Sequence, residues 1–245
     1  MVSDKKLDEF VKRMREASGE NLESVILYGS AVAGDFHPEF SNLNLFCVLR
    51  DSSFAALQAL APVAQWWDGQ KQPPPLFMTR RELQSSTDIF TIELLDMQRH
   101  HWVLFGDDVL QGLQISLHRH HVQVEYELRE KLVLLRQQLL LASGNKSRLW
   151  DLLLRSVSSF VTLFRHALIV LGQPASVGKR DTVQAIAEYL KFDASAIHQV
   201  LDVREHKTSP KAVDMNDLCA RYLMVVEQVT FAVDEALGAD AFASS

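Results

Sequence analysis

The spacing of apolar residues changes near the middle of this 245-residue chain, and this change constrains its fold more than any other feature. Before that point, short apolar runs rich in β-forming residues occupy residues 25–28, 43–49, 76–79 and 89–95. Helix-like segments run from Ser3 to Gly19 and over residues 54–64. Beyond residue 118, apolar residues recur at helical spacing. The sequence therefore predicts an α+β chain, with a mixed-sheet α/β domain at residues 1–115 and an all-helical bundle at residues 116–245.

Two leucine-rich stripes define the longest helices that we expect in the second half. The first stripe contains Leu128, Leu132, Leu135 and Leu139. The second runs from Leu149 to Leu171, and Gly172 and Pro174 end it. Shorter periods predict further helices at residues 182–190, 194–203 and 215–237.

Composition excludes several classes of function. The net charge is −6 and Lys and Arg are not clustered, which argues against a nucleic-acid partner. The N-terminus lacks an apolar signal segment, and no apolar run approaches the roughly 20 residues that cross a bilayer, so we expect neither export nor a membrane. Cys47 and Cys219 lie far apart in apolar patterns, as buried thiols do. We therefore expect a cytoplasmic protein.

One stretch in the first half carries the chemistry that the sequence suggests. Tyr28, Gly29 and Ser30 end an apolar strand in a Gly–Ser turn, and Asn42 and Asn44 follow at the start of the next strand. Residues two apart in a strand point to the same face, so both amides should lie on one side of the sheet.

This arrangement resembles the signature of the polymerase-β-like nucleotidyltransferases, in which a Gly–Ser turn precedes an Asp-x-Asp pair. The chain is most similar to the aminoglycoside nucleotidyltransferase-like group, which joins such a domain to a C-terminal helical bundle. The resemblance implies that the turn opens a helix, that Gly29 and Ser30 bind a nucleotide, and that ATP or another NTP with Mg²⁺ is the cofactor. It places the carboxylate triad at Asn42, Asn44 and Glu93, with Glu93 on a neighbouring strand.

The two asparagines depart from that family pattern. An amide has nearly the shape of a carboxylate but no charge, and a divalent cation is held largely by the charge of its ligands. Two unit charges about 4 Å apart interact at about 4 kcal/mol even at an effective dielectric constant of 20, so losing two carboxylates should weaken Mg²⁺ capture severely. We therefore assign no metal site. Asp35, Glu39 and Asp96 remain as alternative carboxylates for a rearranged site.

The second half offers one further candidate for nucleotide binding. Gly178, Lys179 and Arg180 precede a helix, where N–H groups and cations favour an anion. In the resembling group a lysine from a comparable segment reaches the triphosphate, which implies that role for Lys179. The alternative is an ordinary helix start whose cations face water.

Two other groups of residues have weaker patterns. The pair His100–His101 and the run from His118 to His121 lack the spacing of metal ligands and favour surface or interface positions. Trp66 and Trp67 form an aromatic pair that can stack a ring or fill a subunit contact.

Three functions remain open at this point. The first is a superfamily member with a degenerate metal site and weak or no NMP transfer, retained as a nucleotide-binding, anion-binding or interaction module. The second is an active Mg²⁺-dependent enzyme that transfers NMP to a small hydroxylated acceptor of the aminoglycoside kind. The third is a non-catalytic, self-associating scaffold. The expected partners are a small-molecule nucleotide and further copies of the chain.

Overall fold

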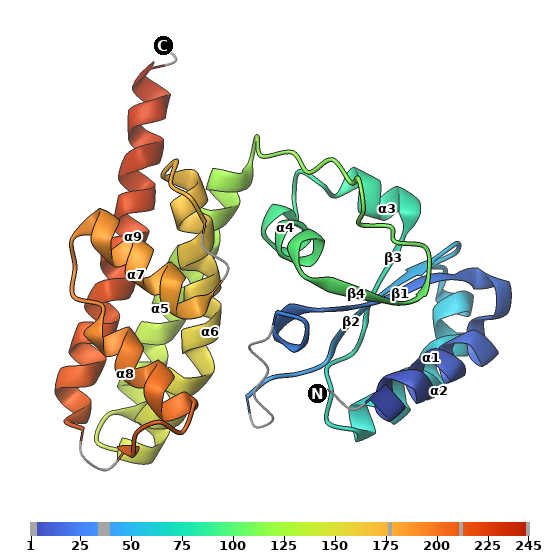
Figure 1. Ribbon diagram of the computed structural model, residues 1–245, viewed down its shortest axis with the longest axis horizontal. Helices are drawn as coiled ribbons and strands as arrows, with labels where there is room; N and C mark the ends of the chain where they lie inside the picture. Colours follow the sequence, from blue (N-terminus) through green and yellow to red (C-terminus); the bar gives the residue numbers. More distant parts are fainter. Residues whose placement is uncertain (1–3, 34–39, 176–177, 211–212, 244–245) are drawn as a thin grey trace. The chain divides into compact units, whose positions relative to one another are not determined.

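The computed structural model describes residues 4–33, 40–175, 178–210 and 213–243, and it divides the chain into two compact units (Figure 1). The first unit is Met1–Leu117 and the second is His118–Ser245. Each unit has its own core, and they are described separately below.

A four-stranded mixed sheet forms the centre of the first unit. Its strands are β1 (Leu22–Tyr28), β2 (Asn44–Leu49), β3 (Leu76–Thr79) and β4 (His101–Gly106), in the spatial order β3-β2-β1-β4. β1 pairs antiparallel with both β2 and β4, whereas β2 pairs parallel with β3. The predicted mixed sheet is therefore confirmed, with β1 and β2 in its middle.

Helices cover both faces of this sheet (Figure 1). α1 (Asp4–Ser18) and α2 (Phe54–Gly69) pack on one face, where Phe10 and Trp67 are fully buried with ring centroids 4.9 Å apart. α3 (Arg80–Ser85) and α4 (Thr91–Arg99) supply Leu83, Leu94 and Met97 to the other face. Alternate residues of β1 and β2 thus enter two separate apolar layers.

The predicted strand at residues 89–95 is wrong, because α4 occupies most of that segment. The run Ile-Phe-Thr-Ile is rich in β-forming residues, but the Glu-Leu-Leu-Asp-Met-Gln-Arg that follows is dominated by good helix formers. Burial of Leu94 and Met97 three residues apart then favours the helix. The fourth strand is instead β4, which begins at His101 and continues through the apolar residues that follow it.

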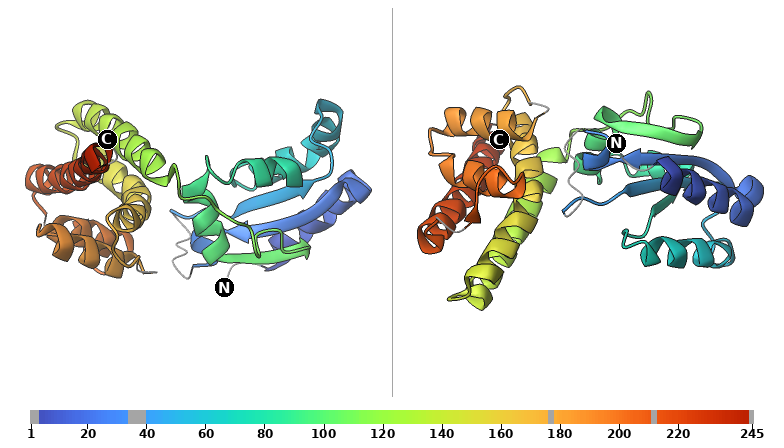
Figure 2. Two further views of the ribbon diagram at one scale, coloured as in Figure 1. Left: turned by 90° about the horizontal axis from the view of Figure 1, so that it is seen from above. Right: turned by 60° about the horizontal axis from the view of Figure 1, so that its bottom comes forward.

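The second unit is all-helical, as predicted. Its helices are α5 (His120–Ala142), α6 (Lys146–Val170), α7 (Lys179–Leu190), α8 (Ser195–Arg204) and α9 (Met215–Ala243). α6 lies in the middle and contacts the other four (Figure 2). The stripe beginning at Leu149 is its buried face, and the stripe beginning at Leu128 is the buried face of α5.

Among the described residues, α6 is the one helix long and apolar enough to cross a bilayer. Half of its most apolar window is buried inside the unit, and its large side chains pack against the surrounding helices. A central helix of a helical core meets the same length and composition criteria, so this feature is weak evidence for a membrane span.

Candidate functional site

The candidate site is the corner where β1 ends and β2 begins. Tyr28, the last residue of β1, lies directly opposite Asn44 on one side and opposite His101 on the other. Directly opposed residues of antiparallel strands point to the same face. Asn44, Tyr28 and His101 therefore form a row across three strands, on the face covered by α4.

Gly29 makes the sharp bend that follows β1. Its φ of +81° lies in the region that favours glycine, and a Cβ built there would lie 2.9 Å from Nδ2 of Asn44. The N–H groups of Val32 and Ala33 donate to the carbonyl of Gly29 at 3.0 and 3.1 Å. These bonds close a 3₁₀ turn over Gly29–Ala31, which contains Ser30, and residues 34–39 beyond it lie outside the described part of the chain.

Asn44 is the first residue of β2, whereas Asn42 lies two residues before the strand. Leu43 and Leu45 between and after them are buried in the layer under α1 and α2, while Asn42 is exposed and Asn44 half-buried. The N–H of Leu43 donates to Oε1 of Gln72 at 2.7 Å, which holds the segment before β2 in place. The Asn44 amide therefore faces the layer that contains Tyr28.

Glu93 reaches this corner from a helix and not from a strand, which corrects the expected position. It lies in the first turn of α4. Its charge acts on Tyr28: burial first, and the Glu93 carboxylate second, raise the pKa of that phenol above its ordinary value. Tyr28 is therefore a neutral hydroxyl group at physiological pH, close to a carboxylate.

In the part of the chain that the structure describes, few acidic side chains lie near the corner. β3, which neighbours β2, consists of Leu76, Phe77, Met78 and Thr79 and contributes no carboxylate. Among the described residues, no group of three His, Cys, Asp or Glu side chains is placed to hold a metal ion. Asp35 and Glu39, two of the alternative ligands, lie outside the described residues, and Asp96 lies in α4 with Glu93.

His101 forms a contact that the sequence did not suggest. Its Nδ1 lies 2.8 Å from the carbonyl of Met97, and its Nε2 lies 3.1 Å from both carboxylate oxygens of Asp108. A carbonyl only accepts, so Nδ1 carries the hydrogen of the contact with Met97, and Nε2 faces the carboxylate of Asp108. This pair ties the end of α4 to the loop after β4, one strand away from Tyr28. In the sequence, the only sign of this contact is that two polar residues, His101 and Asp108, stand on either side of a short apolar run.

We expect Asp108 to stabilise the first unit in a pH-dependent way. Burial alone would raise the pKa of Asp108, but hydrogen bonds from His101 and from the N–H groups of Gln111 and Leu110 outweigh it, so the pKa lies below the ordinary 3.8. Because the folded-state pKa is lowered, this stabilisation is complete above the unfolded-state pKa and is lost as pH falls through the folded-state value.

Denaturant unfolding of Asp108→Asn measured between pH 2.5 and 7 should show less loss of stability in acid than the parent protein shows. The matched control is Asp107→Asn, because that neighbouring carboxylate is 77% exposed and pairs with Arg80 at the surface. An acid response of Asp108→Asn identical to that of the parent would contradict the assignment.

Comparison with known proteins identifies this architecture. The sequence model of one family, described as a nucleotidyltransferase domain, matches residues 7–95, from α1 into α4 and across the whole corner. The N-terminal part of this chain is a nucleotidyltransferase domain. No curated protein matches the chain in sequence.

Solved structures extend the likeness to the fold of both units. The chain is similar to the spectinomycin adenyltransferase AAD(9) from Enterococcus faecialis, solved with ATP and spectinomycin, with 13% identity and a TM-score of 0.58 over 94% of this chain and 99% of that one. At this identity the match shows the fold alone. A toxin–antitoxin structure with AMP-PNP covers 52% of this chain and 98% of its own at 17% identity, but its TM-score of 0.34 supports no argument.

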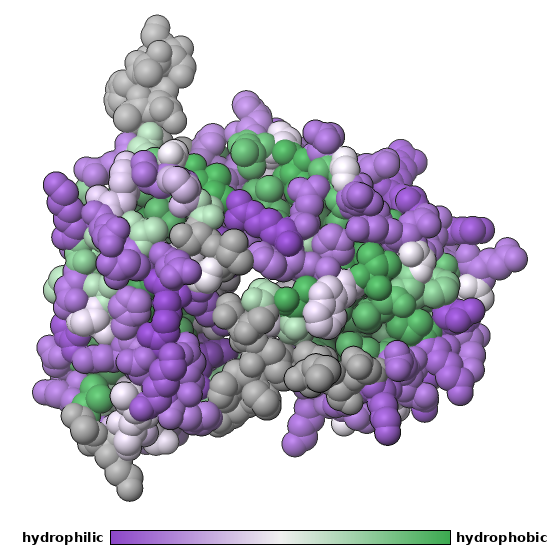
Figure 3. Space-filling view, viewed as in Figure 1, coloured by the Kyte–Doolittle hydropathy of each residue, from purple (hydrophilic) through white to green (hydrophobic). Residues whose placement is uncertain are grey.

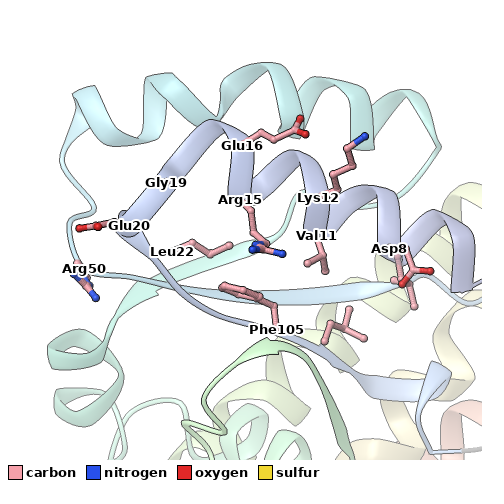
Figure 4. Close-up of a pocket in the computed structure, with 12 residues that line it drawn as sticks. Asp8, Val11, Lys12, Arg15, Glu16, Gly19, Glu20, Leu22, Arg50 and Phe105 are labelled. Carbon is pink, nitrogen blue, oxygen red and sulfur yellow. The ribbon is translucent and has the colours of Figure 1, made fainter.

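A groove of about 860 Å³ also lies in the nucleotidyltransferase domain, along α1 and the end of β4 (Figure 4). Arg15 lies over the ring of Phe105, with 5.0 Å between the guanidinium carbon and the ring centroid. Three basic and three acidic side chains line the groove, so it has no preference for an anion: Lys12, Arg15, Arg50, Asp8, Glu16 and Glu20. Its apolar lining belongs to the layer under α1, on the opposite face from Asn44.

The remaining candidates lie in the helical unit. Lys179 is the first residue of α7 and Gly178 is its N-cap, as expected, while Arg180 pairs with Asp202 and Glu205 at 2.7 and 2.8 Å. His120 is not at the surface as predicted: it is 2% exposed, and its Nε2 lies 3.3 Å from Nδ1 of buried His166. The helical stripe of α5 turns this first-turn histidine inward.

Proposed function

We propose that this protein is a nucleotidyltransferase-superfamily member with a degenerate metal site and weak or no NMP transfer, retained as a nucleotide-binding, anion-binding or interaction module. The observation that carries the proposal is the chemistry of the corner: the positions of the family's metal-binding pair are the neutral amides of Asn42 and Asn44.

The side chains that the structure describes at the corner do not fit a Mg²⁺ ion. Mg²⁺ takes hard oxygen ligands in a near-ideal octahedral arrangement and relies on carboxylates to offset its charge. Here two amides and the Glu93 carboxylate of α4 face the corner, and β3 supplies no acid. We therefore derive no catalytic step through a metal ion.

The remaining polar groups favour binding over transfer. The 3₁₀ turn at Gly29 and Ser30 lies at the position of the family's phosphate-binding turn, and two amides in place of two carboxylates lower the repulsion that a polyanion would otherwise meet without a metal ion. Lys179, at the start of α7, is the cation that we assign to nucleotide binding, because a lysine at a helix start is a suitable anion ligand.

An active enzyme is the second candidate function. In its favour is the similarity in fold to the spectinomycin adenyltransferase, which extends over nearly the whole of both chains. This candidate would transfer NMP from ATP or another NTP to a small hydroxylated acceptor such as an aminoglycoside, with a metal site that does not use the usual pair.

Calorimetry and a turnover assay separate these functions. We expect the parent protein to bind ATP or another NTP with an affinity that EDTA does not change, and to release no pyrophosphate above background with Mg²⁺ and a panel of aminoglycosides. Mg²⁺-dependent pyrophosphate release would establish the enzyme and overturn the proposal. Absence of binding to any of the four NTPs or to inorganic triphosphate would leave only an interaction module.

A further inference from the structure

Helix α5 carries apolar side chains on two faces, and the helical unit covers only one of them. The inner face contributes Val124, Leu128, Leu132 and Leu135 to the core. The outer face exposes six large apolar residues: Val122, Tyr126, Val133, Leu134, Leu140 and Leu141. A helix that is apolar on both faces is normally buried on both, so the outer face needs a partner that the unit itself does not provide.

The position of α5 in the unit agrees with an uncovered outer face. Its packing partners are α6 and α9, and it lies at the edge of the group in the view from above (Figure 2, left). The opposite side of the unit, which faces the viewer in Figure 3, is largely hydrophilic. Among the described residues of this unit, six of the nine large exposed apolar side chains lie on α5, and the other three are Tyr189, Met224 and Phe231.

The outer face has the spacing of a helix–helix contact. Six residues follow one another at alternating intervals of four and three along α5: Val122, Tyr126, Arg129, Val133, Arg136 and Leu140. This is the a/d spacing of a left-handed coiled coil. At 1.5 Å per residue it extends over about 27 Å. We call these six residues the outer seam.

The outer seam can pack against the outer seam of a second copy when the two helices run in opposite directions. If two copies of α5 run antiparallel about the level of Lys131, Val122 meets the partner's Leu140 and Tyr126 meets the partner's Arg136. Arg129 then meets the partner's Val133, which the aliphatic part of the arginine can cover. A parallel arrangement would instead place each arginine against its own copy, which like-charge repulsion disfavours.

Both arginines are held in place by acidic residues of the same chain. Arg129 donates to Glu125 and to Asp234 of α9, and Arg136 donates to Glu227 of α9, each at 2.7 Å. These ion pairs hold the guanidinium groups in place before a partner binds. Arg136 is thus prepared to stack on the partner's Tyr126 through a cation–π contact.

We infer that this protein self-associates through the outer seam of α5, packed antiparallel against α5 of a second copy. The inference concerns the helical unit and does not depend on nucleotide binding. Glu130 flanks the seam close to the two-fold axis, so its two copies approach each other. Glu130→Ala should therefore tighten the association.

Sedimentation velocity over about 1 to 100 µM, a range that spans micromolar dissociation constants, tests this inference. We expect the parent to form a dimer, and Val122→Glu and Leu140→Lys each to raise its dissociation constant at least about tenfold. Because residues 122 and 140 meet only in the antiparallel arrangement, the double variant should recover dimerisation through the Glu–Lys pair. The matched control is Phe54→Glu, which places the same charge on an exposed apolar residue of α2 and should dimerise like the parent.

Three results would overturn the inference. A parent that is monomeric throughout the range would mean that the outer face is covered by something other than a second copy. A dimer insensitive to both single variants would use another surface. A double variant no better than the single variants would reject the antiparallel register. Circular dichroism of each variant establishes that α5 remains folded.

Discussion

Replacing both Asn42 and Asn44 by aspartate is expected to give the corner an affinity for Mg²⁺ that the parent lacks. Asn44 begins β2 and Asn42 lies two residues before it, so the exchange adds two charges at this end of the strand with almost no change of shape. Each added carboxylate attracts a nearby divalent ion by several kcal/mol at an effective dielectric constant of about 20. After desolvation costs we expect at least about a hundredfold gain in affinity, or about 2.7 kcal/mol.

Calorimetry with Mg²⁺ and a non-hydrolysable ATP analogue measures this gain. The single variants should each show a smaller gain, and the control Asn216→Asp, which adds a carboxylate in α9, should show none. We expect pyrophosphate release by the double variant to stay low, because β3 offers no third carboxylate beside β2. A parent that binds Mg²⁺ as tightly as the double variant would refute the proposed degeneration of the site.

Gly106→Ala is expected to be the most damaging small substitution in the nucleotidyltransferase domain. A Cβ at this position, at the end of β4, would lie 1.9 Å from the carbonyl oxygen of Glu23. The obstruction is backbone of the central strand and not a flexible side chain, so β4 must separate from β1 to relieve it. We expect a loss of more than about 4 kcal/mol in the free energy of unfolding, which is exceptional for one methyl group.

Gly112→Ala is the matched control for this substitution. Gly106 and Gly112 share a φ of +76°, but a Cβ at Gly112 would meet no atom within 4 Å. Both variants therefore carry the conformational cost of a left-handed alanine, about 1 to 2 kcal/mol, and only Gly106→Ala carries the collision. Urea unfolding followed by amide exchange in β1 and β4 separates the two effects, and equal losses in both variants would contradict the argument.

The sequence was sufficient to predict the features that depend on local pattern. Apolar runs ending in a Gly–Ser turn predicted β1 and its corner, and the leucine stripes predicted the buried faces of α5 and α6. The alternation of Asn42, Leu43 and Asn44 was sufficient to predict that Leu43 is buried while the asparagines on either side of it are more exposed. These features follow from the periods of two and 3.6 residues, which need no knowledge of distant contacts.

The features that the sequence did not reveal depend on tertiary contacts. Ile92 to Met97 contains both β-forming and helix-forming residues, and only its packing under the sheet determines that Glu93 lies in a helix. β4 is a short edge strand that pairs with β1, about 80 residues earlier in the chain. The contact of His101 with Asp108 likewise depends on the loop that follows β4, so neither residue signalled it.

The close approach of Asn44 to Gly29 also bears on how such a protein can change over generations. The turn fits against an amide, and the rest of β2 is anchored by a fully apolar run from Leu45 to Leu49. Folding of this corner therefore does not require a bound ion, and an ancestor could exchange carboxylates for amides without losing its architecture. Selection on catalysis acts on the charges of the side chains at positions 42 and 44, whereas selection on folding acts on the turn and on the apolar run of β2. The chemistry of the corner can therefore be lost or regained while the fold is kept.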